Sequence, residues 1–183
     1  MLLDEDGTAI GTELKSRVHT DSTPLHRAFS VHLIAPDGRV LVTRRALSKR
    51  TWPGVWTNSL CGHPAPGEAT ADAIRRRAQQ ELIIEPAWLG EPEPLLPEFR
   101  YRAVDASGVV ENEICPVFIV PLLVGADRLV QPNAEEVAEQ RWLEGADLVE
   151  AVQSAPFMVS PWLALHIADE RARRVLSPSA PAR

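Results

Sequence analysis

The first half of the chain alternates between apolar and polar positions in two short runs. Residues 29–34 and 40–43 lie on either side of a Pro-Asp-Gly turn sequence at 36–38. This pattern predicts a β-hairpin. A Pro-Gly pair at 53–54 then fits the two central positions of a type II turn, and a short strand-like run leads from it into Cys61. The pattern therefore predicts that a strand ends at a cysteine.

Helical spacing replaces this alternation after the cysteine. Ile74, Ala78 and Leu82 recur on one stripe, which predicts a helix over about 68–82. Near the end of the chain, Ser-Pro is a start signal for a final helix over 160–176. We expect both helices to bury an apolar face.

The region between these helices is predicted to be mainly β-structure. Residues 98–125 indicate two strands joined at 105–108, the second of them long and strongly apolar after Ile114. Residues 135–153 predict a further strand and a short helix. Strands interleaved with two or three helices, without an internal repeat, favour an α+β fold: a mixed β-sheet sandwich flanked by helices.

Length and composition narrow the class of protein. A chain of 183 residues, 45% hydrophobic and 24% charged, is long enough for one buried core. We expect a single domain over 1–183, with flexible ends at 1–10 and 177–183. The net charge of -6 argues against nucleic acid as a partner. We expect a small-molecule ligand and a monomer or weak homodimer.

The two cysteines and the amino terminus suggest a compartment. Two cysteines form at most one bridge, so the chain does not resemble a disulfide-stapled secreted domain. The start of the chain has no basic and apolar signal regions, and no window approaches the roughly 20 apolar residues of a membrane span. We expect a cytoplasmic protein with no membrane partner.

Two carboxylates stand at the start of the apolar strand. Glu111 and Glu113 share one strand face, because successive side chains alternate between faces. Like charges this close favour a bound cation. A solvated strand end is the ordinary alternative, since exposed carboxylates are common.

Histidines supply further candidate ligands. His19, His26 and His63 lie in loop or strand-edge contexts, and with the two carboxylates they would complete a site for Mn²⁺ or Zn²⁺. For any single histidine, however, a surface or hydrogen-bonded core position is the commoner role. We assign His32 and His166 to that role.

Two further features suit a phosphate and a second metal ion. Glu81 lies on the inward margin of its predicted helix and needs a partner, which is either Arg77 one turn earlier or Mg²⁺. Basic residues concentrate at 43–50, directly before the Pro-Gly turn. This basic run suits a phosphate group, and an exposed basic loop is the alternative.

The run from Gly62 to Ile84 resembles the Nudix box, in which a glycine and a glutamate precede Arg-Glu-x-x-Glu-Glu on a helix. Residues that match the box are Gly62, Glu68, Arg76 and Glu81. Arg77 and Gln80 stand where the family's hydrolases carry metal-binding glutamates, and Ile83 replaces the glycine that usually ends the helix. The hydrolytic metal cluster is therefore incomplete.

A closer resemblance, from about Gly11 to Leu176, is to the type I isopentenyl-diphosphate isomerases, which have a Nudix fold. The motifs that carry it are HRAFSVHL, VLVTRRALSK, WPGVWTNSLCGHP, FRYRA, ENEICPVF and SPW, in that order. Together they combine a cysteine, candidate metal ligands and a basic cluster, which a generic Nudix domain lacks. A Nudix hydrolase and a non-catalytic ligand-binding domain are the rival interpretations.

The resemblance implies a role for each candidate residue. Two groups would transfer protons on opposite faces of the substrate, Glu113 as donor and Cys61 as acceptor by the family's behaviour, although the sequence does not fix these directions. Tyr101 would lie beside them and Trp162 would stabilise a carbocation. The implied ligands of Mn²⁺ or Zn²⁺ are His19, His26, His63, Glu111 and Glu113; those of Mg²⁺ are Glu81 and the Cys61 carbonyl; and those of the diphosphate are Lys15, Arg45, Lys49 and Arg77.

Overall fold

The computed structural model describes residues 1–129 and 131–178. Its larger sheet has the order β12-β5-β4-β11-β8. In chain order its strands are β4 (Phe29–Ile34), β5 (Val40–Arg45), β8 (Glu93–Leu96), β11 (Val117–Pro121) and β12 (Val137–Leu143), with two short additions, β6 (Trp56–Thr57) on β5 and β7 (Leu60–Gly62) on β4.

A smaller sheet has the order β2-β1-β3-β10-β9. Its strands are β1 (Leu2–Leu3), β2 (Ala9–Gly11), β3 (His26–Arg27), β9 (Arg100–Val104) and β10 (Val110–Ile114). The two sheets share two continuous stretches of chain, because β3 leads into β4 and β10 leads into β11. Both pairs run parallel, β3 beside β10 and β4 beside β11.

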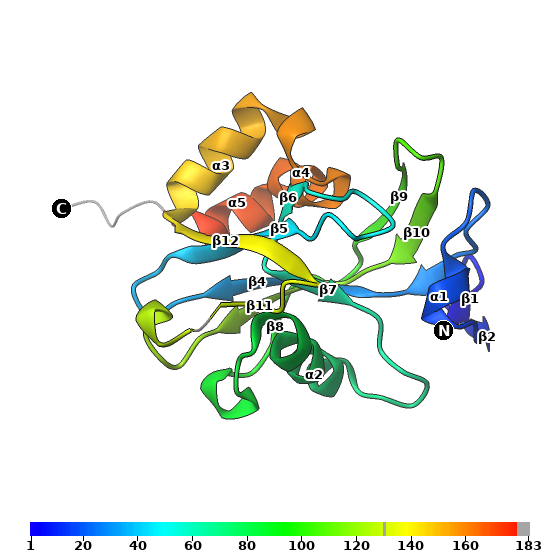
Figure 1. The fold of residues 1–183 in the computed structure, drawn as a ribbon, viewed down its shortest axis with the longest axis horizontal. Coiled ribbons are helices and arrows are strands. Elements are labelled where there is room, and N and C mark those ends of the chain that lie inside the picture. The colour runs from blue at the N-terminus through cyan, green and yellow to red at the C-terminus, as the bar shows by residue number, and fades with distance from the viewer. Residues whose placement is uncertain (130, 179–183) are drawn as a thin grey trace.

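Helices cover both faces of the larger sheet (Figure 1). Helix α2 (Thr70–Leu82) lies on one face, and α3 (Gly145–Ser154), α4 (Pro161–Ala168) and α5 (Glu170–Leu176) lie on the other. The remaining helical segments are α1 (Lys15–Val18) and three 3₁₀ turns, at Pro86–Trp88, Ala126–Arg128 and Pro156–Met158. This α+β sandwich of mixed sheets is the predicted fold class, and it is confirmed.

Alternation along the central strands builds a separate core on each face. Val31, Leu33 and Leu41 pack with the apolar residues of α2, whereas Val40 and Val42 pack with those of α3, α4 and α5. Period-two patterning thus fills both layers from the same strands. No described helix combines the length and the apolar content needed to cross a membrane.

The predicted hairpin is confirmed as two strands, but they separate soon after the turn. β4 and β5 pair only at Ile34 and Val40, and the segment 56–62 enters between them, with β7 pairing to β4 and β6 to β5. The type II turn before this segment is also confirmed, since Gly54 has φ +72° and Val55 N–H donates to the Trp52 carbonyl. The strand containing Cys61 is therefore held inside the sheet.

Three expectations differ from the structure. The long second strand of 98–125 is divided into β10 and β11, because Pro116 lacks an N–H and the two parts join different sheets. The final helix is divided at Asp169, whose side chain caps α5. Residues 1–10, expected to be flexible, include β1 and β2, which pair with each other; β1 also pairs with β3.

The short strands β3 and β8 and the short helix α1 were also not predicted. The other end expected to be flexible is 177–183, and its residues 179–183 lie outside the part of the chain that the structure describes.

Candidate active site

The two parallel strand pairs bring the candidate residues to one place. In the smaller sheet Glu113 lies opposite His26 on β3 and opposite Tyr101 on β9. In the larger sheet Cys61 on β7 lies opposite Ser30 on β4. Since β3 continues into β4, the carboxylate and the thiol come to the same junction between the sheets.

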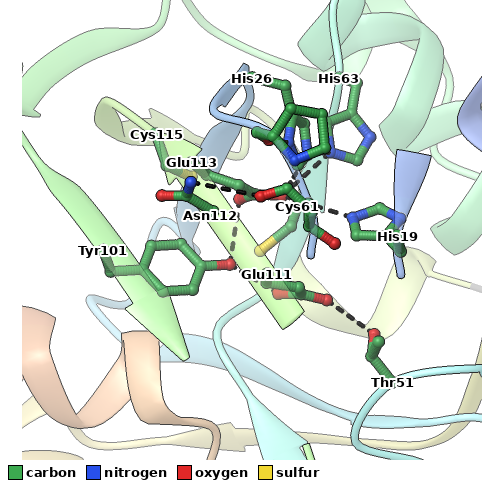
Figure 2. Close-up of polar contacts among 12 residues, drawn as sticks. His19, His26, Thr51, Cys61, His63, Tyr101, Glu111, Asn112, Glu113 and Cys115 are labelled. Carbon is green, nitrogen blue, oxygen red and sulfur yellow. Dashed lines mark hydrogen bonds and ion pairs between the residues drawn. The ribbon is translucent and has the colours of Figure 1, made fainter. Parts of the chain in front are cut away.

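Three imidazoles surround one carboxylate oxygen at this junction (Figure 2). Glu113 Oε1 lies 3.0 Å from His63 Nε2, 3.3 Å from His26 Nε2 and 4.0 Å from His19 Nε2. One ligand atom from each of the four residues lies within 4.8 Å of the other three. The sequence predicted this grouping of His19, His26, His63 and Glu113, and the described residues bring it together.

The geometry of this cluster fits a divalent metal ion. Four of the distances between ligand atoms are 3.0, 3.2, 3.3 and 4.0 Å, and all of them lie within 4.8 Å. Three of these four are close to the roughly 3.4 Å edge of a tetrahedron with metal–nitrogen bonds of about 2.1 Å. His26 Nδ1 lies 2.9 Å from the Pro24 carbonyl, a contact that fixes the tautomer and turns the Nε2 lone pair toward the cluster. His19 Nε2 is buried without a hydrogen-bond partner in the described structure, as expected for a nitrogen that serves as a metal ligand.

A tyrosine hydroxyl connects the two carboxylates of β10. Tyr101 donates to Glu111 Oε2 at 2.7 Å and contacts Glu113 Oε2 at 3.0 Å, while Thr51 donates to Glu111 Oε1 at 2.7 Å. Glu111 therefore lies beside the four-residue cluster rather than within it.

The pKa values of these two carboxyl groups shift in opposite directions. Burial by itself would raise the pKa of Glu113, but the three imidazoles hold it well below its ordinary value. Burial, and then the charge of Glu113, raise the pKa of Glu111. Burial also places the pKa of Tyr101 well above its ordinary value, so the hydroxyl keeps its proton.

The Cys61 thiol lies in a buried polar setting. Its Sγ is 3.3 Å from Ser30 Oγ, and Asn58 Nδ2 donates to it at 3.3 Å. Burial raises the pKa of the thiol to about 12, so the sulfur carries its proton in the substrate-free site. In the substrate-free site the pKa of the thiol is therefore raised, whereas that of the Glu113 carboxyl group is lowered.

Asn58 joins the cysteine to a tryptophan. Its side chain is fully buried, and Oδ1 accepts from Trp162 Nε1 at 2.9 Å while Nδ2 also donates to two backbone carbonyls. Trp162 is 1% exposed, yet its indole lines the cavity that contains Cys61, with the ring of Trp52 edge-on to it at 5.3 Å. The guanidinium of Arg45 lies 5.4 Å from the Trp162 ring centre.

A cavity of about 520 Å³ opens onto this junction, and many of its lining side chains are charged. Its lining includes the basic side chains of Arg45, Lys49, Arg50 and Arg77 and the acidic side chains of Glu81 and Glu136. Arg77 pairs with Glu81 one turn further along α2, and Lys49 pairs with Glu136. Burial raises the pKa of Glu81, although the charge of Arg77 opposes this.

The Nudix-like residues position helix α2 against the site. At Gly62 an added Cβ would lie 2.8 Å from Arg77 Cγ and from Phe29 Cζ, so only glycine allows this approach of α2 to β7. Arg76 forms a bidentate pair with Glu68 and donates to the His63 carbonyl at 3.2 Å. These residues therefore hold the loop that carries His63.

Comparisons with known proteins agree with this architecture. Residues 24–163 match the NUDIX domain. An isopentenyl-diphosphate Delta-isomerase of Kocuria rhizophila is 56% identical over 176 residues, which cover 96% of this chain and 94% of that protein. This chain belongs to the isopentenyl-diphosphate Delta-isomerase family. A second member, from Corynebacterium glutamicum strain R, is 55% identical over 163 residues, covering 89% of this chain and 85% of that protein.

The fold is shared with more distant proteins. The crystal structure of DR0079 from Deinococcus radiodurans has a TM-score of 0.66 at 20% identity, over 91% of this chain and 95% of that one. At such low identity the likeness concerns the fold alone. Within that fold, the isomerase family member described here has Arg77 facing the cavity and Gln80 exposed on α2.

The predicted site residues can now be placed. The cavity lining includes Cys61, Tyr101, Glu111, Glu113 and Trp162, the basic residues Arg45, Lys49 and Arg77, and His19, His63 and Glu81. His26 lies behind them in the metal-ligand cluster. The side chain of Lys15 lies outside the part of the chain that the structure describes.

Sequence reasoning missed Ser30, Thr51, Asn58 and Glu136. One signal was available for Ser30, since it is a small polar residue in a strand whose other residues, apart from His32, are apolar. Asn58 stands in a short irregular link, and Glu136 reaches the site only through tertiary packing, so neither position follows from periodicity.

Proposed function

We propose that the protein interconverts isopentenyl diphosphate and dimethylallyl diphosphate. The observation that carries this proposal is that one cavity contains two proton-transfer groups, Cys61 and Glu113, together with a cluster of cationic side chains. Relatives 51–56% identical to this chain bear the name of that isomerase. The cavity supplies what such a reaction needs, a pair of acid–base groups and a diphosphate anchor.

The reaction moves a double bond by one position. The terminal alkene carbon gains a proton, a tertiary carbocation forms at the next carbon, and the carbon beyond that loses a proton to give the product. One group must donate and another must accept, so two are needed. Cys61 and Glu113 take these parts, and they exchange roles when the reaction runs in reverse.

The diphosphate is held at the charged side of the cavity. Arg45, Lys49 and Arg77 line it there, and we assign Lys15 to the same group from the family resemblance. Glu81 and the Cys61 carbonyl would hold Mg²⁺, which would supply positive charge to offset that of the diphosphate. This assignment explains why an arginine stands at position 77 in place of the hydrolases' glutamate.

The histidine cluster would hold Mn²⁺ or Zn²⁺. Its ligands would be His19, His26, His63 and Glu113, with Glu111 as a fifth from the same strand face. The ion would supply positive charge that fixes the orientation and the acidity of the Glu113 carboxyl group. Tyr101, which bridges Glu113 and Glu111, would then keep the free carboxylate oxygen aimed at the substrate.

Trp162 would face the reacting carbons. The π face of an indole stabilises positive charge by about 2 kcal/mol when desolvated, without forming a bond. Its N–H is already satisfied by Asn58, so the ring is held in one orientation. Closure by Trp52 would help to exclude water, which would otherwise trap the cation.

Direct assay tests the proposal. The purified protein is incubated with isopentenyl diphosphate and Mg²⁺, and the appearance of dimethylallyl diphosphate is followed by proton NMR. We expect isomerisation without stoichiometric release of phosphate or pyrophosphate. Release of phosphate or pyrophosphate from nucleoside diphosphates at a rate above that of isomerisation would instead favour a Nudix hydrolase. That result would contradict the proposal.

The location, oligomeric state and domain organisation of the enzyme are further parts of the proposal. We propose a cytoplasmic enzyme, monomeric or weakly dimeric, that folds as one domain. The family resemblance and the presence of only two cysteines, which favours a reducing compartment, motivate these assignments.

A further inference from the structure

Two of the predicted diphosphate ligands, Lys49 and Arg77, already have carboxylate partners. Arg77 Nη2 contacts Glu81 and lies 3.4 Å from Glu136 Oε2, and the same oxygen contacts Lys49 Nζ. Glu81 was predicted as a Mg²⁺ ligand, whereas no role was predicted for Glu136. These four side chains line the cavity together and carry two positive and two negative charges.

An incoming diphosphate therefore competes with carboxylates. Arg77 Nε has no hydrogen-bond partner in the described structure and the Lys49 ammonium has three N–H groups, so both side chains keep donors for phosphate oxygens while Glu81 and Glu136 stay close. The carboxylates then lie next to a polyanion in a partly buried site, where like charges repel by several kcal/mol. Mg²⁺ between the diphosphate and the carboxylates would remove that repulsion.

We infer that Glu136 makes diphosphate binding depend on Mg²⁺. It pairs with Lys49 and Arg77 when the site is empty and disfavours a metal-free diphosphate, so that the site selects the magnesium complex. This inference rests on the proposed function, because it concerns the diphosphate end of the same cavity. Glu136 acts as a specificity-determining residue and takes no part in proton transfer.

The variant Glu136→Gln keeps the local structure. The loop after β5 is attached to the residues before β12 through backbone groups, since Ala46 N–H donates to the Glu136 carbonyl at 3.1 Å and Ser48 Oγ to the Glu135 carbonyl at 3.4 Å. Neither contact uses the Glu136 carboxylate. Glu139→Gln is a matched control on β12, since Glu139 pairs with Arg44 and Arg141 outside the cavity.

The test is calorimetric binding of inorganic pyrophosphate at pH 8 and constant ionic strength, with and without Mg²⁺. We expect the unchanged protein and Glu139→Gln to bind pyrophosphate tightly only with Mg²⁺. Glu136→Gln should bind metal-free pyrophosphate about tenfold more tightly than the unchanged protein, because one like-charge repulsion is gone. The ratio of affinities with and without Mg²⁺ should fall accordingly.

Three results would overturn the inference. Equal metal-free affinity of Glu136→Gln and the unchanged protein would show that Glu136 does not exclude the free anion. Weaker binding by Glu136→Gln both with and without Mg²⁺ would show that Glu136 only supports the loop. No pyrophosphate binding by any of these proteins, even with Mg²⁺, would overturn the diphosphate site of the proposed function together with this inference.

Discussion

Ile83 ends helix α2 in the left-handed conformation, with φ 56° and ψ 32°. For a β-branched residue this conformation costs about 1–3 kcal/mol, and glycine adopts it without strain. The side chain is 46% exposed, so it regains little by burial. Isoleucine in place of the Nudix-box glycine therefore strains the backbone locally, and helix α2 forms in spite of this strain.

Replacing Ile83 by glycine should stabilise the protein. Relief of strain exceeds the added entropy of glycine in the unfolded chain, so we expect Ile83→Gly to raise the free energy of unfolding by about 1 kcal/mol and Tm by about 2–4 °C. Val175→Gly is the control, because Val175 is also β-branched and 45% exposed but lies within helix α5, where glycine costs about 1 kcal/mol. Scanning calorimetry of both variants measures the two changes in stability. Equal destabilisation by the two substitutions would show that Ile83 is not strained.

The two cysteines form a natural pair for comparison. Ser30 Oγ lies 3.3 Å from Cys61 Sγ and 3.4 Å from Cys115 Sγ, but only Cys61 lines the cavity. Cys115 is 1% exposed in an apolar cluster, in agreement with the small buried thiol that we predicted.

Removal of each thiol should have different effects. Cys61→Ala removes a proton carrier and should lower turnover by about 10²–10⁴-fold, with pyrophosphate affinity within about twofold. Cys115→Ala should cost about 1 kcal/mol of stability and change turnover by less than about threefold. Turnover, calorimetric affinity and thermal melts measured on both variants test this, and similar losses of turnover would refute the role of Cys61.

At the scale of elements, β4 and helix α4 meet through two buried histidines. His32 Nε2 lies 3.2 Å from His166 Nδ1, both side chains are fully buried, and the ring of Phe99 lies edge-on to His166 at 4.6 Å. Burial lowers the pKa of His32 to about 4, and burial with the nearby His32 lowers the pKa of His166 well below its ordinary value. Both imidazoles are neutral in the folded protein at neutral pH, as their core assignment predicted.

This pair should destabilise the fold in acid. Below pH 6.5 the unfolded chain binds protons that the folded chain does not bind, so the free energy of unfolding falls as pH falls toward 4 and is fully restored above 6.5. For His32 the fall over that range is roughly 3 kcal/mol. Between pH 7 and pH 5, His32 alone accounts for roughly 2 kcal/mol, and His166 adds to it, so the metal-stripped protein should lose more than roughly 2 kcal/mol relative to the double variant His32→Leu/His166→Leu.

Chemical denaturation of the two metal-stripped proteins at each pH measures the difference. Metal stripping keeps release of a bound ion from contributing to the pH dependence. If the free energy of unfolding changed equally with pH in the two proteins, the histidine pair would make no contribution to the loss of stability in acid.

At the scale of the molecule, the histidine cluster connects distant parts of the chain. His19 follows α1, His26 lies on β3, His63 follows β7 and Glu113 lies on β10. An ion bound to all four would link the N-terminal segment to both sheets, and binding to the folded state alone would stabilise it.

Metal removal should therefore loosen the whole fold. With free metal about a thousandfold above its dissociation constant, chelation should lower the free energy of unfolding by about 4 kcal/mol. His26→Gln should lose both bound Mn or Zn and this chelator effect, whereas Glu81→Gln should keep that metal and require more Mg²⁺ for turnover. Elemental analysis and thermal melts check the variants, and full metal retention in His19, His26 and His63 variants would refute the site.

The sequence by itself determined most of the local elements and named most of the candidate site residues. Periodicity located β4, β5, α2, β12 and α3, because a buried strand or helix face must repeat with the period of its backbone. The family resemblance singled out Cys61, Glu113 and the three histidines, because the motifs that carry the resemblance are short contiguous segments of the chain. These are properties of short stretches, and a short stretch is enough to reveal them.

Only the tertiary structure decided how those stretches meet. The division at Pro116 follows from which sheet each half joins, and the entry of 56–62 between β4 and β5 depends on pairing across the sheet. The bridging of Cys61 and Trp162 by Asn58, and the contact of Glu136 with Arg77, join residues far apart in sequence. Such contacts are selected by burial and hydrogen bonding in the packed molecule, and no period along the chain encodes them.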